Sequence, residues 1–202
     1  MNIFEKLYKE LKKKYGRPQG QWNLWCKRPK TEEEREEVAM GAILTQRTNW
    51  KNAELALSNL KKAKIHFFKD VYKLNIKKLA TLIRPSGFYQ AKANYLFYLI
   101  EFIVKNQGNL EKMRKANQGE LREQLLKLKG IGPETADSIL LYALDKPIFV
   151  IDEYTRRLVK KQNLAKNFSY PFLQKLFEKN LKKDYCLYQD FHALIIIDGK
   201  KH

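Results

Sequence analysis

The sequence lacks any long apolar run. Across its 202 residues, no segment approaches the roughly 20 consecutive apolar residues that a membrane-spanning helix needs, and the N-terminus carries no apolar stretch of the signal-peptide type. These absences predict a soluble, cytoplasmic protein that has no membrane partner.

Cysteine is also scarce. The two cysteines, Cys26 and Cys186, lie far apart and form no CxxC pair, so they cannot supply the four thiolates of a zinc or iron–sulfur site. A disulfide between them is not expected in a reducing compartment. The sequence therefore predicts no metal site, and it assigns both cysteines to packing.

Acidic residues are outnumbered by basic ones. The chain has 40 Lys and Arg against 22 Asp and Glu, which gives a formal net charge of +18. Such an excess attracts polyanions, and nucleic acid is the favoured partner. The alternative is a lysine-rich solvated surface, because many lysines lie in mixed runs such as "EKLYKELKKKYGR".

Apolar residues recur at helical spacing almost throughout, as at Ala53, Leu57 and Leu60. Glycine- and proline-containing breakers such as "RPSG", the two "NQG" stretches and "KGIGP" divide this pattern into short pieces. We read "DKPIFVID" as an extended connection, since it has no obvious partner strand. The pattern predicts an all-α protein.

One turn between two predicted helices has a composition suited to binding an anion. A helix ending near Lys129 is followed by Gly130-Ile131-Gly132, with Pro133 opening a second helix over about Glu134–Leu144. Glycine allows close backbone approach, and the amides of the second helix point towards an incoming phosphate. The sequence thus predicts a helix-hairpin-helix that positions DNA without reading bases. A plain packing corner is the alternative.

The surrounding segments resemble a known family. "LKGIGPETAD", followed by the aspartate of "VIDEYTRR", resembles the helix-hairpin-helix and catalytic Asp of the endonuclease III superfamily of DNA glycosylases. "AMGAILTQRTNW", "LIRPSGFYQAKANYL" and "FHALIIIDGK" are similar to further family segments, in the same order and spacing. The match looks closest to the bacterial 3-methyladenine DNA glycosylases.

This resemblance implies a monomer with two all-α lobes around a DNA-binding cleft. We expect residues 27–146 to form a helical barrel lobe with the hairpin, and residues 1–26 plus 147–202 to form the second lobe. The implied partner is double-stranded DNA that contains a damaged base, which places the protein at the nucleoid. The late "FHALIII" run should pack against "IFEKLYKELKKKY".

The resemblance also implies site residues. Asp152 takes the position of the catalytic aspartate, where a carboxylate stabilises an oxocarbenium-like sugar; it can also serve as an N-cap, and the two roles are compatible. Gln46 matches the glutamine that wedges into the duplex, and a polar residue at a helix end is its alternative. The expected DNA contacts are Gln46, Lys129, Gly130, Ile131, Gly132 and Thr135.

A flipped base needs a pocket, and a cationic alkylated base suits aromatic walls. The candidates are Trp22, Trp25 and Trp50, with Glu134 near the pocket. Tryptophan is also a common core residue. For Glu134 the plainer role, which we favour, is to stabilise the dipole in the first helical turn.

Two departures from the family limit what carries over. Bifunctional members have a lysine after the hairpin, whereas this chain has Glu134, which cannot form an imine. A monofunctional enzyme is expected unless Lys127 or Lys129 substitutes. Many relatives have four cysteines that bind an iron–sulfur cluster, and this chain lacks them. We therefore expect no cofactor in this chain: either it belongs to a branch without the cluster, or the sequence stops before the cluster ligands. The rivals are a glycosylase or lyase for an oxidised or mismatched base and a non-catalytic DNA-structure binder.

Overall fold

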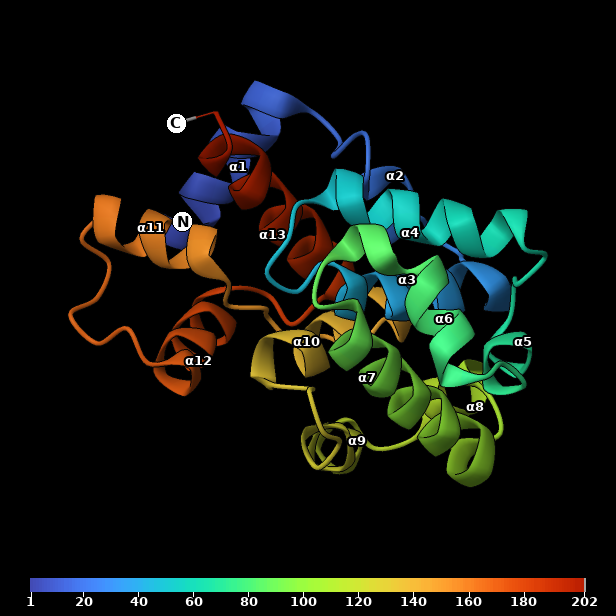
Figure 1. Ribbon diagram of the computed structural model, residues 1–202. Coiled ribbons are helices and arrows are strands. Elements are labelled where there is room, and N and C mark those ends of the chain that lie inside the picture. The colour runs from blue at the N-terminus through green and yellow to red at the C-terminus, as the bar shows by residue number, and fades with distance from the viewer. Residues whose placement is uncertain (202) are drawn as a thin grey trace. The chain divides into compact units, whose positions relative to one another are not determined.

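The computed structural model describes residues 1–201 apart from the side chain of Gln107, and every regular element among them is helical (Figure 1). No described residue belongs to a β-strand, and residues 145–152 form an irregular connection, as expected for "DKPIFVID". The all-α prediction is confirmed. The chain divides into two compact units, which are described in turn.

The first unit combines Met1–Arg28 with the chain from Asp145 onward. Its first helix begins with a capping box, in which the Asn2 side chain accepts from the backbone of Phe4 and Glu5 while the Glu5 carboxylate accepts from the Asn2 amide. The helices of this unit are α1 (Ile3–Tyr15), α2 (Trp22–Trp25), α11 (Glu153–Lys161), α12 (Tyr170–Asn180) and α13 (Tyr185–Gly199).

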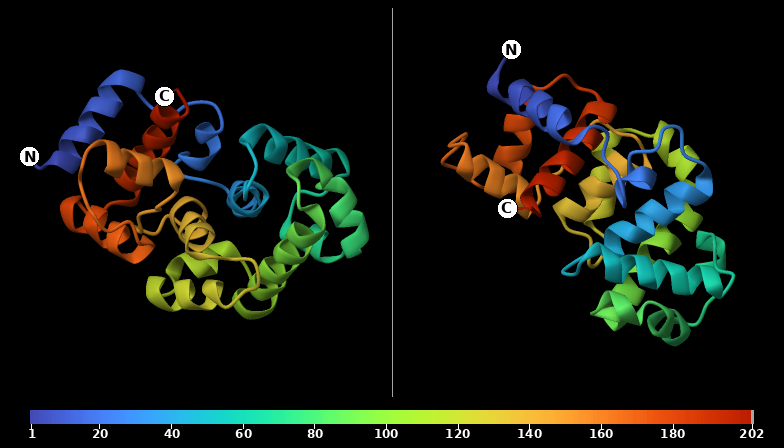
Figure 2. Two further views of the ribbon diagram at one scale, coloured as in Figure 1. Left: turned by 60° about the vertical axis from the view of Figure 1, so that its left-hand side comes forward. Right: turned by 90° about the horizontal axis from the view of Figure 1, so that it is seen from above.

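Aromatic side chains form the core of the first unit. The rings of Phe149 and Phe177 stack with their centroids 4.4 Å apart, and Phe191 of α13 packs on both from 5.9 and 6.0 Å. Tyr8 of α1 lies 5.5 Å from Phe191, and α1 and α13 lie side by side in Figure 2. The predicted packing of "FHALIII" against the N-terminal helix is confirmed.

The second unit spans Pro29–Leu144. Two of its elements are π-helices, η2 and η3, and each continues the α-helix before it. Its elements are α3 (Glu32–Leu44), α4 (Trp50–Lys62), α5 (Phe68–Tyr72), α6 (Ile76–Leu82), η1 (Arg84–Ser86), α7 (Tyr89–Phe102), η2 (Ile103–Gln107), α8 (Leu110–Lys115), α9 (Gln118–Leu126), α10 (Pro133–Ser138) and η3 (Ile139–Ala143).

Helix α3 is the central helix of the second unit. Every residue from Val38 to Leu44 is buried, and the helix packs against α4, α7 and η3. The buried guanidinium of Arg35 donates to the carbonyl of Ala143 at 2.6 Å. This bond gives a partner to a backbone carbonyl at the C-terminal end of η3. A helix buried on all sides holds its C-terminal end, and the loop that follows it, in a fixed position.

The predicted hairpin lies between α9 and α10. The buried carboxylate of Asp137 accepts two hydrogen bonds from Arg122 of α9, at 2.6 and 3.0 Å, and so ties the two helices together. The second helix covers the predicted range but is α-helical only to Ser138 and continues as η3. The predicted breaker "NQG" that ends at Gly119 lies at the boundary between α8 and α9, where Asn117 caps α9.

Candidate functional site

The turn of the hairpin is built around two glycines with different geometry. Gly130 has a φ of +86°, and a Cβ placed there would lie 2.2 Å from the ring of Tyr95. Gly132 is extended and exposed, and a Cβ there would meet nothing within 4 Å. Gly130 is therefore required by the fold, whereas Gly132 leaves the start of α10 open to an approaching group.

The remaining hairpin residues divide between interior and surface. Ile131 is buried and anchors the turn, and Thr135 is buried in the first turn of α10. Glu134 is exposed in that same turn, where a carboxylate stabilises the positive end of the helix dipole. Gly132 is the N-cap and supplies no side-chain cap to the amides of the turn.

Gln46 contacts the hairpin directly. It lies just after α3, and its Nε2 donates to the carbonyl of Gly130 at 2.9 Å and to Oγ1 of Thr135 at 3.0 Å. Both hydrogens of the amide group are thus used. The structure brings together three of the residues expected to contact DNA, and it ties the α3–α4 loop to the hairpin.

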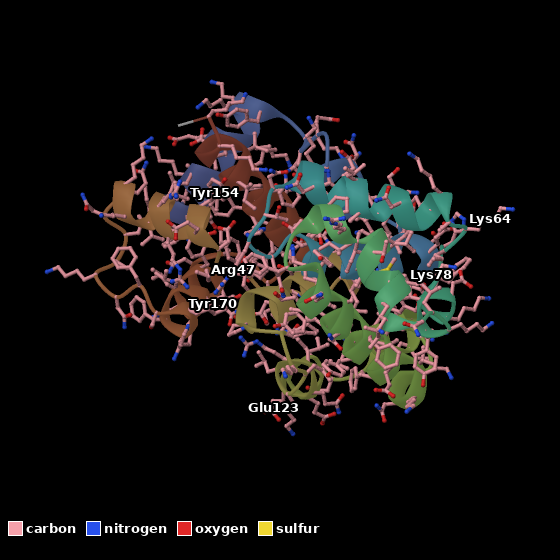
Figure 3. All side chains as sticks on the ribbon, viewed as in Figure 1. Arg47, Lys64, Lys78, Glu123, Tyr154 and Tyr170 are labelled. Carbon is pink, nitrogen blue, oxygen red and sulfur yellow. The ribbon has the colours of Figure 1, made fainter. Side chains whose placement is uncertain are left out.

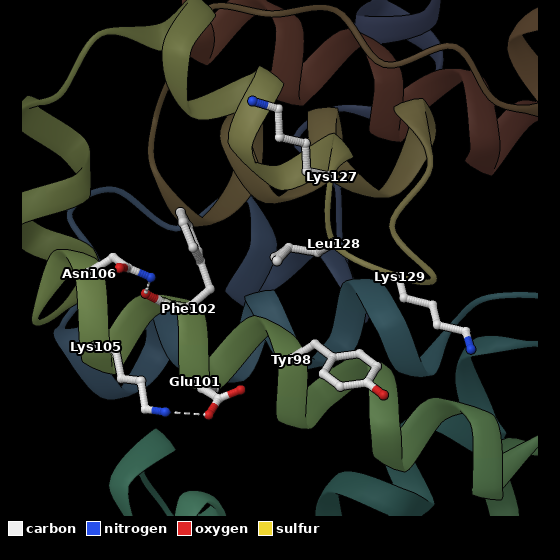
Figure 4. Close-up of a pocket in the computed structure, with 8 residues that line it drawn as sticks. All are labelled: Tyr98, Glu101, Phe102, Lys105, Asn106, Lys127, Leu128 and Lys129. Carbon is white, nitrogen blue, oxygen red and sulfur yellow. Dashed lines mark hydrogen bonds and ion pairs between the residues drawn. The ribbon is translucent and has the colours of Figure 1, made fainter.

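Two lysines stand on the turn before Gly130. Lys127 and Lys129 are exposed and border a pocket of about 460 Å³ between that turn and α7 (Figure 4). The pocket is lined by Tyr98, Glu101, Phe102, Lys105, Asn106, Lys127, Leu128 and Lys129. The carboxylate of Glu101 pairs with Lys105 at 2.6 Å, so the charge that these residues offer to an anion comes from the two lysines of the turn.

A buried lysine, Lys92, stabilises the C-terminal end of α3, which leads to Gln46. The amine of Lys92 donates to the carbonyls of Leu44 and Ser86 at 2.8 and 2.7 Å, and burial lowers its pKa to about 8. Leu44 is the last residue of α3, so Lys92 caps the helix end that leads to Gln46. Sequence reasoning missed this role, although Lys92 lies within the "GFYQAKANYL" segment.

Asp152 lies in the first unit, at the start of α11. Its Oδ1 accepts from the amide of Thr155 at 2.7 Å, which makes it the N-cap of the helix. Its Oδ2 lies 3.7 Å from Nε2 of His192 in α13, and both residues are buried. The helix amide and the packing around His192 fix the direction of the carboxylate, as an electrostatic catalyst requires.

Burial lowers the pKa of His192, and the nearby Asp152 carboxylate opposes the shift. The imidazole is therefore neutral at neutral pH. Sequence reasoning did not single out His192, because forty positions separate it from Asp152 and only the fold brings the two together. Its place in the "FHALIII" run was the one available signal.

The candidate pocket residues are distributed over both units. Trp22 and Trp25 are buried in the first unit with ring centroids 5.8 Å apart, and Trp22 stands edge-on to the His192 ring at 6.3 Å. Trp50 begins α4 in the second unit and is half-buried. Glu134 belongs to the same unit. His192 thus contacts Trp22 on one side and lies close to Asp152 on the other. The pocket roles of Trp22, Trp25, Trp50 and Glu134 stay a prediction.

Helix α11 carries a cationic surface directly after Asp152. A pocket of about 470 Å³ is lined by Glu153, Arg156, Arg157, Lys160 and Phe168. Arg157 pairs with Glu153 at 3.0 Å, and Arg156 donates to the carbonyl of Phe168. A negatively charged backbone that approached Asp152 would meet this surface.

The described part of the chain contains neither a cluster of metal ligands nor a membrane-spanning helix. No three His, Cys, Asp or Glu side chains among residues 1–201 converge as metal ligands, and none of the described helices combines the length and apolar character that crossing a bilayer requires. The thiol of Cys26 is buried and donates to the carbonyl of Gln189, in accordance with a packing role.

Comparison with known proteins gives consistent matches. Residues 40–183 match the family described as HhH-GPD superfamily base excision DNA repair protein. A putative DNA repair glycosylase of Methanocaldococcus jannaschii is 45% identical over 208 residues, which cover 99% of this chain and 90% of that protein. Endonuclease III of Sulfolobus acidocaldarius is 28% identical over 164 residues, covering 80% and 71%.

Solved structures agree with these matches. A crystal structure of the 3-methyladenine DNA glycosylase of H. pylori, bound to 1,N6-ethenoadenine, has a TM-score of 0.83 and 32% identity and covers 100% of this chain and 98% of that chain. An endonuclease III trapped on DNA shares the fold, with a TM-score of 0.77, 19% identity and coverage of 100% and 88%. The protein therefore belongs to the HhH-GPD superfamily of base excision DNA repair proteins, and it is a DNA glycosylase.

Proposed function

We propose that this glycosylase is monofunctional and releases alkylated adenine of the 3-methyladenine type from double-stranded DNA, acting as a monomer. The observation that carries the chemistry is the Asp152 carboxylate, which the amide of Thr155 holds at 2.7 Å within a buried site. The similarity to the 3-methyladenine glycosylase of H. pylori supports this class of base.

The carboxylate acts on the sugar. Breaking the glycosidic bond leaves positive charge on the deoxyribose, and a fixed carboxylate stabilises that charge and orients the attacking water. Thr155 engages only Oδ1, so Oδ2 is the oxygen that this mechanism assigns to the sugar or the water. A 3-methylated adenine is already cationic and leaves without a strong general acid, which matches a site whose neighbouring histidine is neutral.

The cationic base also accounts for the aromatic candidates. Tryptophan faces attract a cationic ring, and the interaction amounts to about 1–2 kcal/mol once water is excluded. Trp22 is the candidate of the first unit whose ring contacts His192, the neighbour of Asp152. Trp50 is the corresponding candidate of the second unit.

The absence of a lyase step follows from Glu134. Its carboxylate occupies the sequence position of the imine-forming lysine of bifunctional relatives, and a carboxylate cannot form an imine. The lysines closest in sequence, Lys127 and Lys129, stand exposed on the turn before Gly130. We assign them to phosphate contacts, because a nucleophile tolerates little displacement from its reacting carbon.

The test is to incubate genomic DNA that has been alkylated by a methylating agent with the protein and to identify the released bases by mass. Release of 3-methyladenine supports the proposal, and borohydride should trap no protein–DNA adduct. Release of an oxidised or mismatched base from suitable duplexes instead would assign another lesion. A trapped adduct would show a lyase, and failure to release any base from the alkylated DNA would contradict the proposed substrate.

A further inference from the structure

We infer that Arg47, rather than Gln46, is the side chain that enters the duplex and occupies the space vacated by the flipped nucleotide. This inference rests on the proposed function, since an enzyme that flips a nucleotide has to fill the vacancy. It changes the expectation drawn from the "LTQRTNW" segment, in which Gln46 has that role.

Gln46 is already engaged within the protein. Its amide group donates to the Gly130 carbonyl and the Thr135 hydroxyl, at 2.9 and 3.0 Å, and the side chain is half-buried. Extending it into DNA would break both bonds and release the α3–α4 loop from the hairpin. The Gln46 side chain cannot keep these hydrogen bonds and enter the duplex at the same time. We therefore assign Gln46 to holding the α3–α4 loop against the hairpin.

Arg47 has the opposite character. It is exposed, its backbone has a φ of +50°, and it makes no hydrogen bond or ion pair with any described residue. Arg47 belongs to the second unit and is labelled in Figure 3. A left-handed backbone is unfavourable for arginine, as it is for Lys64 and three further non-glycine residues of the described chain.

The loop that presents Arg47 is held at both ends. The turn is closed by a hydrogen bond of 3.2 Å from the amide of Thr48 to the carbonyl of Thr45. Thr45 also donates to the Gly41 carbonyl at 2.8 Å, and Asn49 caps α4. Arg47 is therefore the exposed residue of a short, anchored turn, and little backbone freedom remains to be lost when it meets DNA.

The chemistry of arginine suits the vacancy. A guanidinium is planar, stacks on base faces and carries five donors that can satisfy the base left without a partner. Arginine also enters narrow minor grooves, where the negative potential is strong. Gln46 offers a smaller, neutral group whose two donors are already used.

The experiment uses a duplex with a stable abasic analogue opposite 2-aminopurine, because this DNA contains no base to be released. A side chain that enters the stack beside the orphaned 2-aminopurine changes its fluorescence. The variants are Arg47→Gly, Arg47→Lys and Gln46→Ala. Glycine accepts a positive φ, so Arg47→Gly should melt no lower than the wild type.

Lys64 provides the matched control. It is an exposed cation with a φ of +60°, and the 13 residues of α4 separate it from the Arg47 loop, which is about 20 Å of helix. Lys64→Gly removes the same charge and the same backbone strain at the other end of that helix.

Arg47→Gly should abolish the fluorescence change and reduce the preference for abasic over intact duplex at least tenfold. Arg47→Lys should keep the affinity for intact DNA but lose most of the preference, and Lys64→Gly should keep both. Retention of the signal in Arg47→Gly together with its loss in Gln46→Ala would overturn the inference, as would a wild type without any preference. The result does not depend on which base the enzyme releases, so failure of the proposed substrate is seen separately.

Discussion

At the scale of single residues, His192 gives a test of the surroundings of Asp152. Because burial lowers the pKa of His192 below its usual value of about 6.5, the unfolded chain takes up a proton at a higher pH than the folded protein does. The stabilisation from the neutral imidazole is therefore complete above about pH 6.5, and it is lost as the pH falls below that value, by at most about 1.4 kcal/mol per pH unit.

The measurement compares urea unfolding of the wild type and His192→Gln at pH 7.5 and pH 5. Glutamine does not titrate, so the free-energy difference between the two proteins should favour the wild type less at pH 5. Titration of all other groups cancels in the comparison. An equal difference at both pH values would show that His192 is not held neutral.

How far single residues could be predicted depends on the distance of their partners in sequence. The capping role of Asp152 follows from its place just before a helix, and Thr155 lies three residues later. The contact of Gln46 with Gly130 spans 84 positions, and no periodicity encodes such a pair. Sequence reasoning therefore found Gln46 through a motif but not the hydrogen bonds that now favour Arg47 as the inserted residue.

At the scale of elements, the hairpin makes the two glycines experimentally distinct. Gly132 has an extended backbone, and a Cβ there would meet no atom within 4 Å. Valine adopts this conformation readily, as residues before a proline such as Pro133 usually do. Gly132→Val should fold normally and bind every DNA sequence about tenfold more weakly, because its side chain stands where a phosphate approaches. Binding curves on several unrelated duplexes, together with melting curves, check this.

Gly130→Val serves as the structural comparison. Its positive φ and the 2.2 Å approach of the Tyr95 ring predict a loss of stability, of about 1–3 kcal/mol for overpacking alone. If Gly132→Val kept full affinity on all duplexes, the hairpin would be only a packing corner.

Element boundaries show which patterns carry information. The glycines and Pro133 located the hairpin, because each residue type has a strong local preference. The change from α10 to a π-helix after Ser138 has no such local signal, and the tertiary contact made there, from Arg35 to the carbonyl of Ala143, joins residues 108 positions apart. The "NQG" stretch that ends at Gly119 marked a real boundary, because α8 ends at Lys115 and Asn117 caps the start of α9.

At the scale of the whole molecule, the net charge of +18 predicts largely electrostatic DNA binding. The logarithm of the affinity should fall linearly with the logarithm of the salt concentration, by about 0.9 for each phosphate contacted, so a footprint of about six phosphates gives a slope near −5. Titration of a lesion-free duplex between 50 and 300 mM salt measures it. A slope near zero would contradict phosphate-dominated binding.

The helical class of the whole chain was predictable because apolar spacing repeats along nearly all of it. The predicted apolar positions, such as Leu57 and Leu60, are buried. The assignment to the endonuclease III superfamily depended on four motifs in order, not on periodicity. The choice of damaged base depends on side chains gathered from distant segments, and for this reason it stays a proposal.

The most direct test of the central claim is single-turnover base release by Asp152→Asn on a duplex with one 3-methyladenine-type lesion. Asparagine keeps the shape and can still accept from the Thr155 amide, so folding should persist and DNA affinity should stay within about threefold. The excision rate should fall by about 10²–10³, because one preorganised charge is lost. Excision by Asp152→Asn at a rate close to that of the wild type would contradict the catalytic role of Asp152.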